Sequence, residues 1–283
     1  LRGLRMATLS LAEERLPENP LILGGAGSIG PYGGDIRSGF TLEYGSFAAD
    51  MRDGEVGRHI VPLLFQGLVA YDQDLRLRAN LCESWEQNED ATRFVYHLRK
   101  GLKWSDGAPL TSADARFFQD HVASDPDLAI MAPGAEPEVS DLLTPDSFTL
   151  EYRLAQPRPF HPYEMAHRLP MLPAHHLERW HGAFTDPALL AEAVKESPAR
   201  TWKGLFTLQG NWAHNPDLPV AHTWVLASDP RGERVILARN PYAFQVDSEG
   251  RQLPYLDHLI LVRYDAPGAL REAVLRADVD VQA

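Results

Sequence analysis

The sequence predicts a mixed fold of the α/β or α+β class, and three observations lead to this prediction. With 283 residues and an apolar content of 44%, the chain can bury one large core or two modest ones. Short segments with the two-residue period of a strand occur beside segments with the period of a helix. They follow one another without a regular strand–helix alternation, which favours a mixed arrangement over a purely parallel sheet.

The N-terminal part is expected to contain two helices and one strand. Residues 1–16 alternate Arg with Leu, a pattern typical of an amphipathic helix. A short apolar segment (20–23) and a glycine-rich stretch that ends at Gly34 come next. Residues 35–42 then predict a strand, and residues 57–69 predict a helix.

The segment from residue 64 to residue 114 has the most informative pattern in the chain. Leu81 and Trp85 have the spacing of neighbours on one helix face, so a short helix is expected there. In residues 94–98 apolar side chains alternate with other side chains, which predicts a half-buried strand.

Two turns and a helix start are expected after this strand. Lys100-Gly101 and Asp106-Gly107 are dipeptides typical of turns. Thr111 followed by Asp114 has the spacing of a capping box, which indicates the first turn of a helix. The apolar face of that helix is expected to consist of Phe117, Phe118 and Val122.

The remaining elements follow from the same periodicities and from the positions of proline and glycine. They are a loop at 126–145, a strand at 148–152, helices at 173–181 and 189–194, an irregular segment up to residue 222, paired strands at 224–226 and 235–237, a strand at 259–263 and a helix at 269–275.

The charge of the chain is strongly acidic. Its net charge of -12, without a basic run, argues against nucleic acid as a partner and against binding to an anionic membrane surface. Acidity of this size serves solubility, and a cationic ligand is the alternative interpretation.

Cysteine content and hydropathy leave the cellular compartment open. Cys82 is the only cysteine, which excludes an intrachain disulfide, and its apolar neighbourhood favours a core position over a nucleophile. Apolar runs stay shorter than the roughly 18 residues that span a bilayer. Residues 1–16 lack the features of a secretory signal, so for an exported protein the signal is not present in this sequence.

A formal dinucleotide-binding motif, G-x-G-x-x-G, occupies residues 25–30. In such a motif the pyrophosphate binds at the N-terminus of the helix that follows. Here Pro31-Tyr32-Gly33-Gly34 comes next and shows no helical pattern, so we interpret the glycines as an entry loop. A nucleotide-dependent oxidoreductase remains the alternative function, and no cofactor is expected.

Other candidate chemistry is sparse. His175, His176 and His181 lie close in sequence, but their spacing does not place three imidazoles on one helix face. We therefore expect solvated or capping histidines, no metal site and no catalytic residue. The motifs G-x-S-x-G and H-E-x-x-H do not occur.

The order and spacing of the elements in residues 64–114 resemble the family 5 extracellular solute-binding proteins, the peptide and nickel type that serve ABC importers. The resemblance covers about residues 30–283 and is poorest at 182–222. It continues at 146–157, at Leu172-Pro173-Ala174-His175, at 233–242, which ends in Arg-Asn-Pro-Tyr, at 245–257, which resembles an extension found in oligosaccharide and peptide binders, and at Ala277-Asp278-Val279-Asp280.

The resemblance implies a fold like that of type II periplasmic binding proteins, in which two lobes close on a ligand around a hinge. It implies a discontinuous ligand lobe formed by residues 1–66 and 177–266, with a peripheral domain inserted at 67–176. Residues 267–283 would begin a second lobe. Because family members continue well beyond this point, we expect a fragment, with an apolar groove left on the first lobe.

The resemblance also places the solute contacts at loop ends of the ligand lobe. Flat aromatic side chains suit this role because they stack on sugar faces or peptide side chains and lose little rotamer entropy. The predicted contacts are Gly39, Phe40, Thr41 and Tyr44 after the first strand, Trp224 at a position that is aromatic in the family, and Trp202 and Trp212 in the poorly matched segment.

The expected function is therefore the receptor component of an ABC importer, which captures oligopeptides or oligosaccharides and delivers them to a membrane permease. Such a protein is not an enzyme and works in the periplasm or outside the cell, in some cases through a lipid anchor. A sensor or interaction module of the same fold, without a role in transport, is a further alternative.

Overall fold

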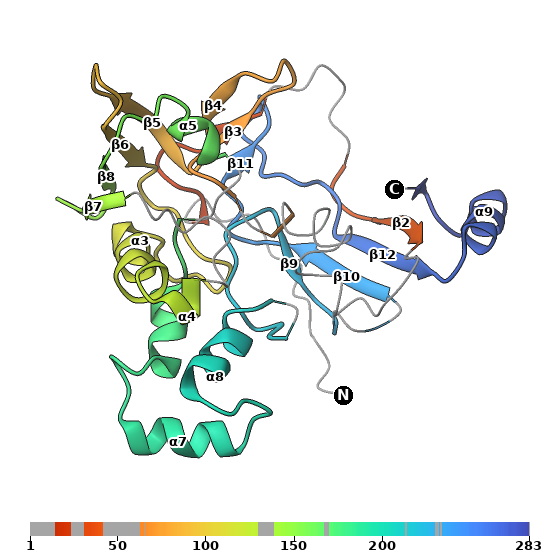
Figure 1. The fold of residues 1–283 in the computed structure, drawn as a ribbon. Helices are drawn as coiled ribbons and strands as arrows, with labels where there is room; N and C mark the ends of the chain where they lie inside the picture. The colour runs from red at the N-terminus through yellow and green to blue at the C-terminus, as the bar shows by residue number, and fades with distance from the viewer. Residues whose placement is uncertain are drawn as a thin grey trace.

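A computed structural model gives the fold of the chain (Figure 1). It describes residues 15–23, 31–41, 63–64, 66–129, 139–166, 170–212, 214–229, 232 and 234–282. Nearly all of the helix expected at 1–16, most of the helix expected at 57–69, the glycine motif at 25–30 and Tyr44 lie outside the described residues.

A five-stranded sheet places a strand from near the start of the chain between strands from its end. The strand order is β13 (Val281–Gln282), β2 (Asp35–Thr41), β12 (His258–Tyr264), β10 (Arg234–Arg239) and β9 (Trp224–Leu226). Strand β2 is parallel to both of its neighbours, whereas β12, β10 and β9 are antiparallel to one another. The strands expected at 35–42, 224–226, 235–237 and 259–263 are confirmed.

A four-stranded antiparallel sheet lies on the other side of the molecule (Figure 1). Its order is β5 (Cys82–Gln87), β6 (Arg93–Leu98), β8 (Thr149–Leu154) and β7 (Val139–Leu143). The hairpin β3 (Val69–Tyr71) and β4 (Leu77–Ala79) precedes it, and β1 (Leu21–Ile22) pairs with β11 (Gln245–Val246). The strands expected from residues 94–98 and 148–152 are confirmed. The helix expected at 57–69 is wrong in its last residues, because residues 66–68 are not helical and Val69 begins β3.

The structure corrects the short helix expected at Leu81 and Trp85. Trp85 belongs to strand β5 and lies opposite Tyr96, while Leu81 directly precedes that strand and is fully buried. Four-residue spacing also fits a strand, and pairing with β6 decides between the two. The loop expected at 126–145 is also wrong in part, because it contains β7 and the short helix α4 (Pro126–Ala129).

The capping box is confirmed at the start of helix α3 (Ser112–Phe118). Asp114 accepts a hydrogen bond from the Thr111 backbone N–H at 2.9 Å. A segment of π-helix (Gln119–Ala123), called the π-helical segment below, continues α3. Both expected turns have a glycine in the left-handed region, Gly101 at a φ of 84° and Gly107 at 90°.

The other helices lie below the two larger sheets, at one edge of the molecule, and beside the hairpin of β3 and β4 at the top (Figure 1). They are α5 (His161–Glu164), α6 (Ala174–Leu177) with a 3-10 turn (Glu178–Trp180), α7 (Pro187–Lys195), α8 (Trp202–Gln209) and α9 (Pro267–Leu275). The helices expected at 173–181, 189–194 and 269–275 are confirmed. Helix α8 was not expected, although Thr201 caps it by accepting from Gly204 N–H. Among the described residues, no helix has the length and apolar character needed to cross a bilayer.

Two hydrophobic cores hold these layers together. The first core lies under the four-stranded sheet and contains Phe94, Tyr96 and Trp104, all fully buried. The second core lies between the five-stranded sheet and helices α3, α6 and α8, and it includes Phe206 and Trp224. Helix α3 contributes to both, so it joins the two halves of the molecule.

Candidate functional site

The end of strand β2 is the part of the predicted site that the structure describes best. Phe40 and Thr41 lie beside Arg263 and Tyr264 of β12. Since paired residues of parallel strands face the same way, Phe40 shares one face of the sheet with Arg263, and Thr41 shares the other with Tyr264. Phe40 packs against the second core and is half-buried, as is Thr41.

Gly39 faces helix α9, on the side of the sheet opposite Phe40. A β-carbon at Gly39 would lie 2.6 Å from Leu270 Cδ1 and 3.0 Å from Val279 Cγ1. This close approach explains why a glycine stands at this position, because any side chain would push α9 away from the sheet. Only backbone atoms of Gly39 are left for a solute contact.

The three tryptophans predicted as solute contacts differ in how much of each residue is exposed. Trp212 and Trp224 are each 7% exposed and belong to the second core. Trp202 is half-buried at the first turn of α8, with its ring centroid 4.8 Å from that of His181. The structure thus brings Phe40 and the three tryptophans to one core, and Phe40 and Trp202 keep more exposed ring surface than Trp212 and Trp224 do.

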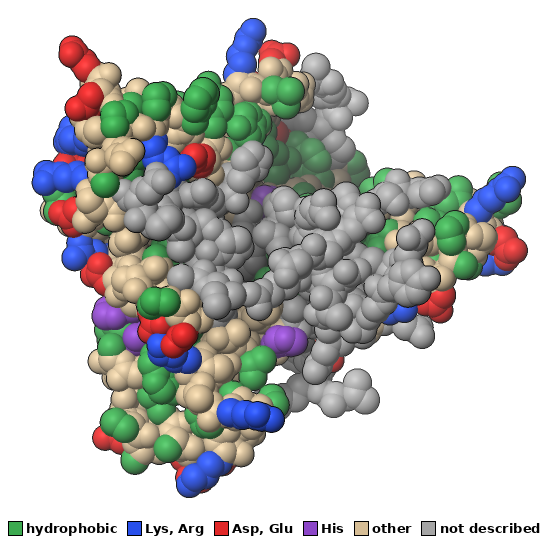
Figure 2. All heavy atoms as spheres, in the orientation of Figure 1, with side chains coloured by type: hydrophobic (Ala, Val, Ile, Leu, Met, Phe, Trp, Pro, Cys, Tyr) green, Lys and Arg blue, Asp and Glu red, His purple; other side chains and the backbone are tan. Residues whose placement is uncertain are grey.

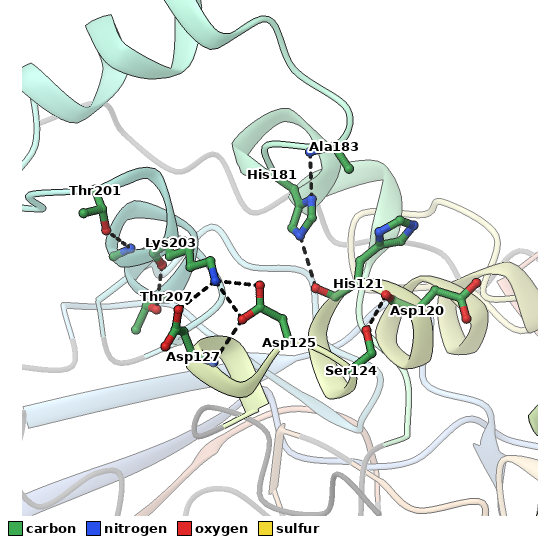
Figure 3. A network of polar contacts seen from close by, with 11 residues as sticks. Asp120, His121, Ser124, Asp125, Asp127, His181, Ala183, Thr201, Lys203 and Thr207 are labelled. Carbon is green, nitrogen blue, oxygen red and sulfur yellow. Dashed lines mark hydrogen bonds and ion pairs between the residues drawn. The ribbon is translucent and has the colours of Figure 1, made fainter. Parts of the chain in front are cut away.

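A polar network that was not expected from the sequence lies between the π-helical segment, the start of α4, residues 181–183 and α8 (Figure 3). Lys203 of α8 lies 2.7 Å from a carboxylate oxygen of Asp125 and 2.8 Å from one of Asp127. His181 contacts the backbone of His121 in the π-helical segment. Residues far apart in sequence form this network, so no local pattern could have revealed it.

Two open cavities of about 450 and 440 Å³ flank this network, and Asp120 and His121 line both. Thr111, Arg116 and Phe117 also line the first cavity. None of the six predicted solute contacts that the structure describes lines either cavity. These two cavities are therefore lined by other residues than the described part of the predicted ligand edge.

The electrostatics of the network follow from its hydrogen bonds. Hydrogen bonds from Lys203 to Asp125 and Asp127 raise the pKa of the Lys203 ammonium group. The same contact lowers the pKa of Asp125. Burial lowers the pKa of His181, which favours its neutral form.

The histidines at 175–181 do not form one cluster. His175 Nε2 lies 2.7 Å from Asp106 Oδ2, and His176 contacts the side-chain amide of Asn215. His181 is 5% exposed and therefore not solvated, but its Nδ1 accepts from the Ala183 backbone N–H after the 3-10 turn, which agrees with the capping role expected as the alternative. Within the residues that the structure describes, no group of three or more potential metal ligands comes together.

Cys82 is a buried member of the first core, as the sequence indicated. Burial raises the pKa of its thiol to about 12, and the thiolate form is therefore disfavoured.

The segment 245–257 packs against the loop that leads into β2. The Tyr255 hydroxyl donates to Asp247 Oδ2 at 2.5 Å, and its ring contacts Tyr32 edge-on at 5.5 Å. Burial alone would raise the pKa of Asp247, but hydrogen bonds from Tyr255 and from backbone N–H groups lower it to about 2. These contacts fix the loop before the predicted solute-binding strand.

The surface carries acidic and basic side chains side by side on the face shown in Figure 2. Ion pairs among the described residues include Arg93 with Glu151 and Arg37 with Asp280. The two signs of charge are therefore interspersed on the described part of the face in Figure 2.

The fold and the sequence match one family of proteins. Residues 76–283 fit the model of the bacterial extracellular solute-binding proteins, family 5, middle region. The chain belongs to this family. Its members among the relatives are transport binding proteins, which agrees with the resemblance found in residues 64–114.

Individual family 5 proteins show the likeness in more detail. The chain is 30% identical over 265 residues to a periplasmic α-galactoside-binding protein of Rhizobium meliloti (strain 1021). The matched region covers 87% of this chain and 36% of that protein. A solved oligopeptide-binding protein OppA is 27% identical, with a TM-score of 0.82 over 95% of this chain and 41% of its own. The periplasmic binding protein MelB of Agrobacterium fabrum C58, solved with stachyose, is 25% identical, with a TM-score of 0.72 over 94% of this chain and 40% of its own. The chain thus spans less than half the length of these relatives.

Proposed function

We propose that this chain forms the ligand lobe and the peripheral domain of a receptor for an ABC importer. The receptor captures an oligopeptide or an oligosaccharide between two lobes, and closure around the solute signals to a permease in the membrane. It is not an enzyme, and it works in the periplasm or at the cell surface. The α-galactoside-binding protein and OppA support the two solute classes.

The insertion of β2 between β12 and β13 is the observation that carries the proposal. A strand from near the start of the chain completes a sheet formed by its end, which supports a discontinuous ligand lobe at 1–66 and 177–266. The four-stranded sheet supports a peripheral domain inserted at 67–176. Residues 267–283 pack on this same lobe, through the contact of α9 with β2 and the pairing of β13 with β2, and we propose that the chain enters the second lobe from there.

We assign the solute contact in this lobe chiefly to Phe40 and Thr41 at the end of β2, with Trp202 as a further aromatic contact. The half-buried ring of Phe40 is held by the second core, so little side-chain entropy is lost when a solute packs on it. Gly39 supports the same edge by letting α9 approach. Tyr44, Trp212 and Trp224 stay in the proposal as supporting positions.

A thermal-shift screen of the complete gene product tests the function. Short peptides form one arm, and stachyose and raffinose form the other. A specific ligand at about a hundredfold excess over its Kd stabilises the folded state by about 2.7 kcal/mol, which gives a measurable rise in Tm. A rise in one arm alone assigns the solute class, and the absence of a rise in both arms would overturn the proposed receptor.

A further inference from the structure

Arg263 of strand β12 stands at the edge of the sheet where the proposed solute contacts lie. Strands β2 and β12 are parallel and end at the same edge, beside α9 (Figure 1). Arg263 pairs with Phe40 in the register of these strands, so both side chains leave the sheet on the same face. Arg263 is therefore the charged neighbour of the aromatic residue that we assign to solute contact.

The strand residues below Arg263 on this face are not charged. Leu261 precedes it at two-residue spacing and belongs to the second core. Leu261 in turn lies between Ser38 of β2 and Val235 of β10. Within the described strands β2, β10 and β12, the neighbours of Arg263 on this face therefore supply no carboxylate.

In the described part of the chain, the Arg263 guanidinium has one partner, Asp265. Arg263 Nη2 lies 3.1 Å from Asp265 Oδ1, and the Asp265 side chain is 88% exposed. An ion pair with so exposed a carboxylate contributes little to stability, because water and salt screen it. Asp265 thus binds one corner of the guanidinium weakly and can be displaced by a stronger acceptor.

Two further donor atoms of Arg263 have no acceptor among the residues that the structure describes. Nε is buried and unpaired, whereas Nη1 is unpaired but not buried. The Nε–H group has lost its hydrogen bond to water without gaining another, which costs free energy of folding. Nη1 and Nη2 remain accessible, since the side chain as a whole is 29% exposed. The guanidinium therefore contributes little to the fold and keeps donors for another molecule.

Two other arginines of the same sheet are better paired. Arg37 of β2 donates from Nε and Nη2 to the two carboxylate oxygens of Asp280. Arg239 of β10 lies 2.8 Å from a carboxylate oxygen of Asp257. Both pairs join residues far apart in sequence, whereas Arg263 has a partner two residues away. The spare donors thus occur at the edge that carries Phe40.

We propose that Arg263 and Phe40 together recognise a solute that carries a carboxylate beside an apolar group. Nη1 and Nη2 donate two parallel hydrogen bonds to the carboxylate, Asp265 gives way at Nη2, and the Phe40 ring packs against the apolar part. This inference rests on the proposed receptor function and narrows its solute to acidic molecules. The carboxylate belongs to the C-terminus of a peptide or to an acidic sugar.

A carboxylate suits this position better than a neutral hydroxyl group does. The guanidinium is permanently charged and planar, and its paired N–H groups match the two oxygens of a carboxylate. Hydrogen bonds between charged partners are about twice as strong as those between neutral ones. Because the net charge of -12 repels an anion at a distance, recognition depends on this local positive charge.

Isothermal titration of the complete gene product tests the assignment first without any variant. Tripeptides with an aromatic side chain are compared with the same peptides amidated at the C-terminus, and trigalacturonate is compared with its methyl ester. In the arm that contains the solute class, loss of the carboxylate is expected to weaken binding about 10- to 100-fold. Equal or tighter binding of the uncharged forms, or binding of neutral stachyose alone, would overturn the assignment. Failure of every solute to bind would overturn the receptor proposal itself, and the assignment with it.

Variants of Arg263 then assign the effect to this residue. Arg263→Met keeps the apolar stem, and Arg263→Lys keeps the charge without the planar group. The Met variant is expected to bind the acid as weakly as wild type binds the amide or ester, and to bind the uncharged form as wild type does. The Lys variant is expected to lie between Met and wild type. A purely structural role would weaken both forms alike, and this result would contradict the assignment.

Arg76→Met is the matched control. Arg76 also pairs with an aspartate two residues away, Asp74, but it lies in the turn between β3 and β4. This variant is expected to keep the wild-type affinity for the acid and for the uncharged form. A loss of affinity for the acid as large as that of Arg263→Met would refute a specific role of Arg263.

The unpaired Nε also predicts the stability of the protein without solute. Arg263→Met removes a buried donor that lacks an acceptor, so its Tm is expected at or above that of wild type. Scanning calorimetry in the absence of solute provides the measurement. A clearly lower Tm would show that the guanidinium serves the fold and would count against its assignment to the solute.

Discussion

Gly39 of strand β2 lies directly beneath Leu270 of helix α9, so closely that a β-carbon at Gly39 would stand 2.6 Å from Leu270 Cδ1. The same β-carbon would meet Val279 and Tyr264 at 3.0 and 3.2 Å. The helix that leads toward the second lobe is thus seated on the strand that carries the proposed solute contacts. A change on one element is transmitted to the other by direct packing.

We expect Gly39→Ala to lower the free energy of unfolding by about 1–3 kcal/mol, because it overpacks the interface between β2 and α9. Urea denaturation measures the loss. Truncation in Leu270→Ala provides room, so the double variant is expected to lose less than the sum of the two single losses. Gly268→Ala is the control, since nothing lies within 4 Å of a β-carbon there. Equal losses in the Gly39 and Gly268 variants would refute this packing.

Asp114 is a second position where stability depends on hydrogen bonds. Its carboxylate accepts from the backbone N–H of Thr111 at 2.9 Å and of Ala174 at 3.1 Å, and the residue is buried. Asp114→Ala leaves both donors without this acceptor, so we expect a loss of about 1–3 kcal/mol for each buried donor.

Asp186→Ala is the matched control for Asp114, because Asp186 caps α7 at an exposed position. Its loss is expected near the usual value for a cap, about 0.5–2 kcal/mol. Urea denaturation of both variants compares the two sites. A larger loss at Asp186 than at Asp114 would contradict the greater contribution expected from the buried hydrogen bonds of Asp114.

The sequence predicted elements well where a local pattern determines them. Alternation at 94–98 and the capping box at Thr111 are complete within a few residues, and the structure confirms both. Leu81 and Trp85 show the opposite case, because only pairing with β6 selects a strand there. Helix α8 begins with Trp202 and contains Gly204, so its stability comes from packing on the second core and not from propensity.

The candidate site was less predictable because it depends on contacts between distant residues. Pairing of Phe40 with Arg263 joins the start and the end of the chain, and no local pattern specifies that register. The aromatic rings that pack around His181 likewise include those of Phe117 and Phe206, which come from separate helices. Burial of Trp212 and Trp224 shows that residue type alone does not separate a core aromatic from a solute contact.

The roles of Phe40 and Trp224 can be separated by mutation in the complete protein. Phe40→Ala is expected to weaken solute binding about tenfold, as for an aromatic contact worth more than 1 kcal/mol. Trp224→Ala is expected to lower stability by about 3–5 kcal/mol, because it leaves a cavity in the second core. Isothermal titration with the solute found by the thermal screen, together with urea denaturation, measures both effects.

Phe160→Ala is the control for Phe40, since Phe160 is an exposed aromatic residue at the start of α5, far from β2 in the fold (Figure 1). It is expected to leave the affinity for the solute unchanged. Unchanged affinity in the Phe40 variant as well would remove Phe40 from the site. The receptor function would then rest on other contacts of the lobe.

Acid should weaken the packing of segment 245–257 through Asp247. A carboxylate whose folded pKa is about 2 stabilises the fold above its ordinary value of 3.8 and loses this contribution as the pH falls through about 2. Asp247→Asn removes the charged acceptor for Tyr255 and Arg251. We therefore expect this variant to have a lower Tm than wild type near neutral pH.

The difference in Tm between wild type and Asp247→Asn is expected to shrink as the pH is lowered from about 5 toward 2, because wild-type Asp247 then becomes protonated. Asp217→Asn, at an exposed carboxylate, is the control and should show a small difference at every pH. Scanning calorimetry over this range provides the measurement. A difference that stays constant with pH would mean that Asp247 contributes through its shape alone and not through its charge.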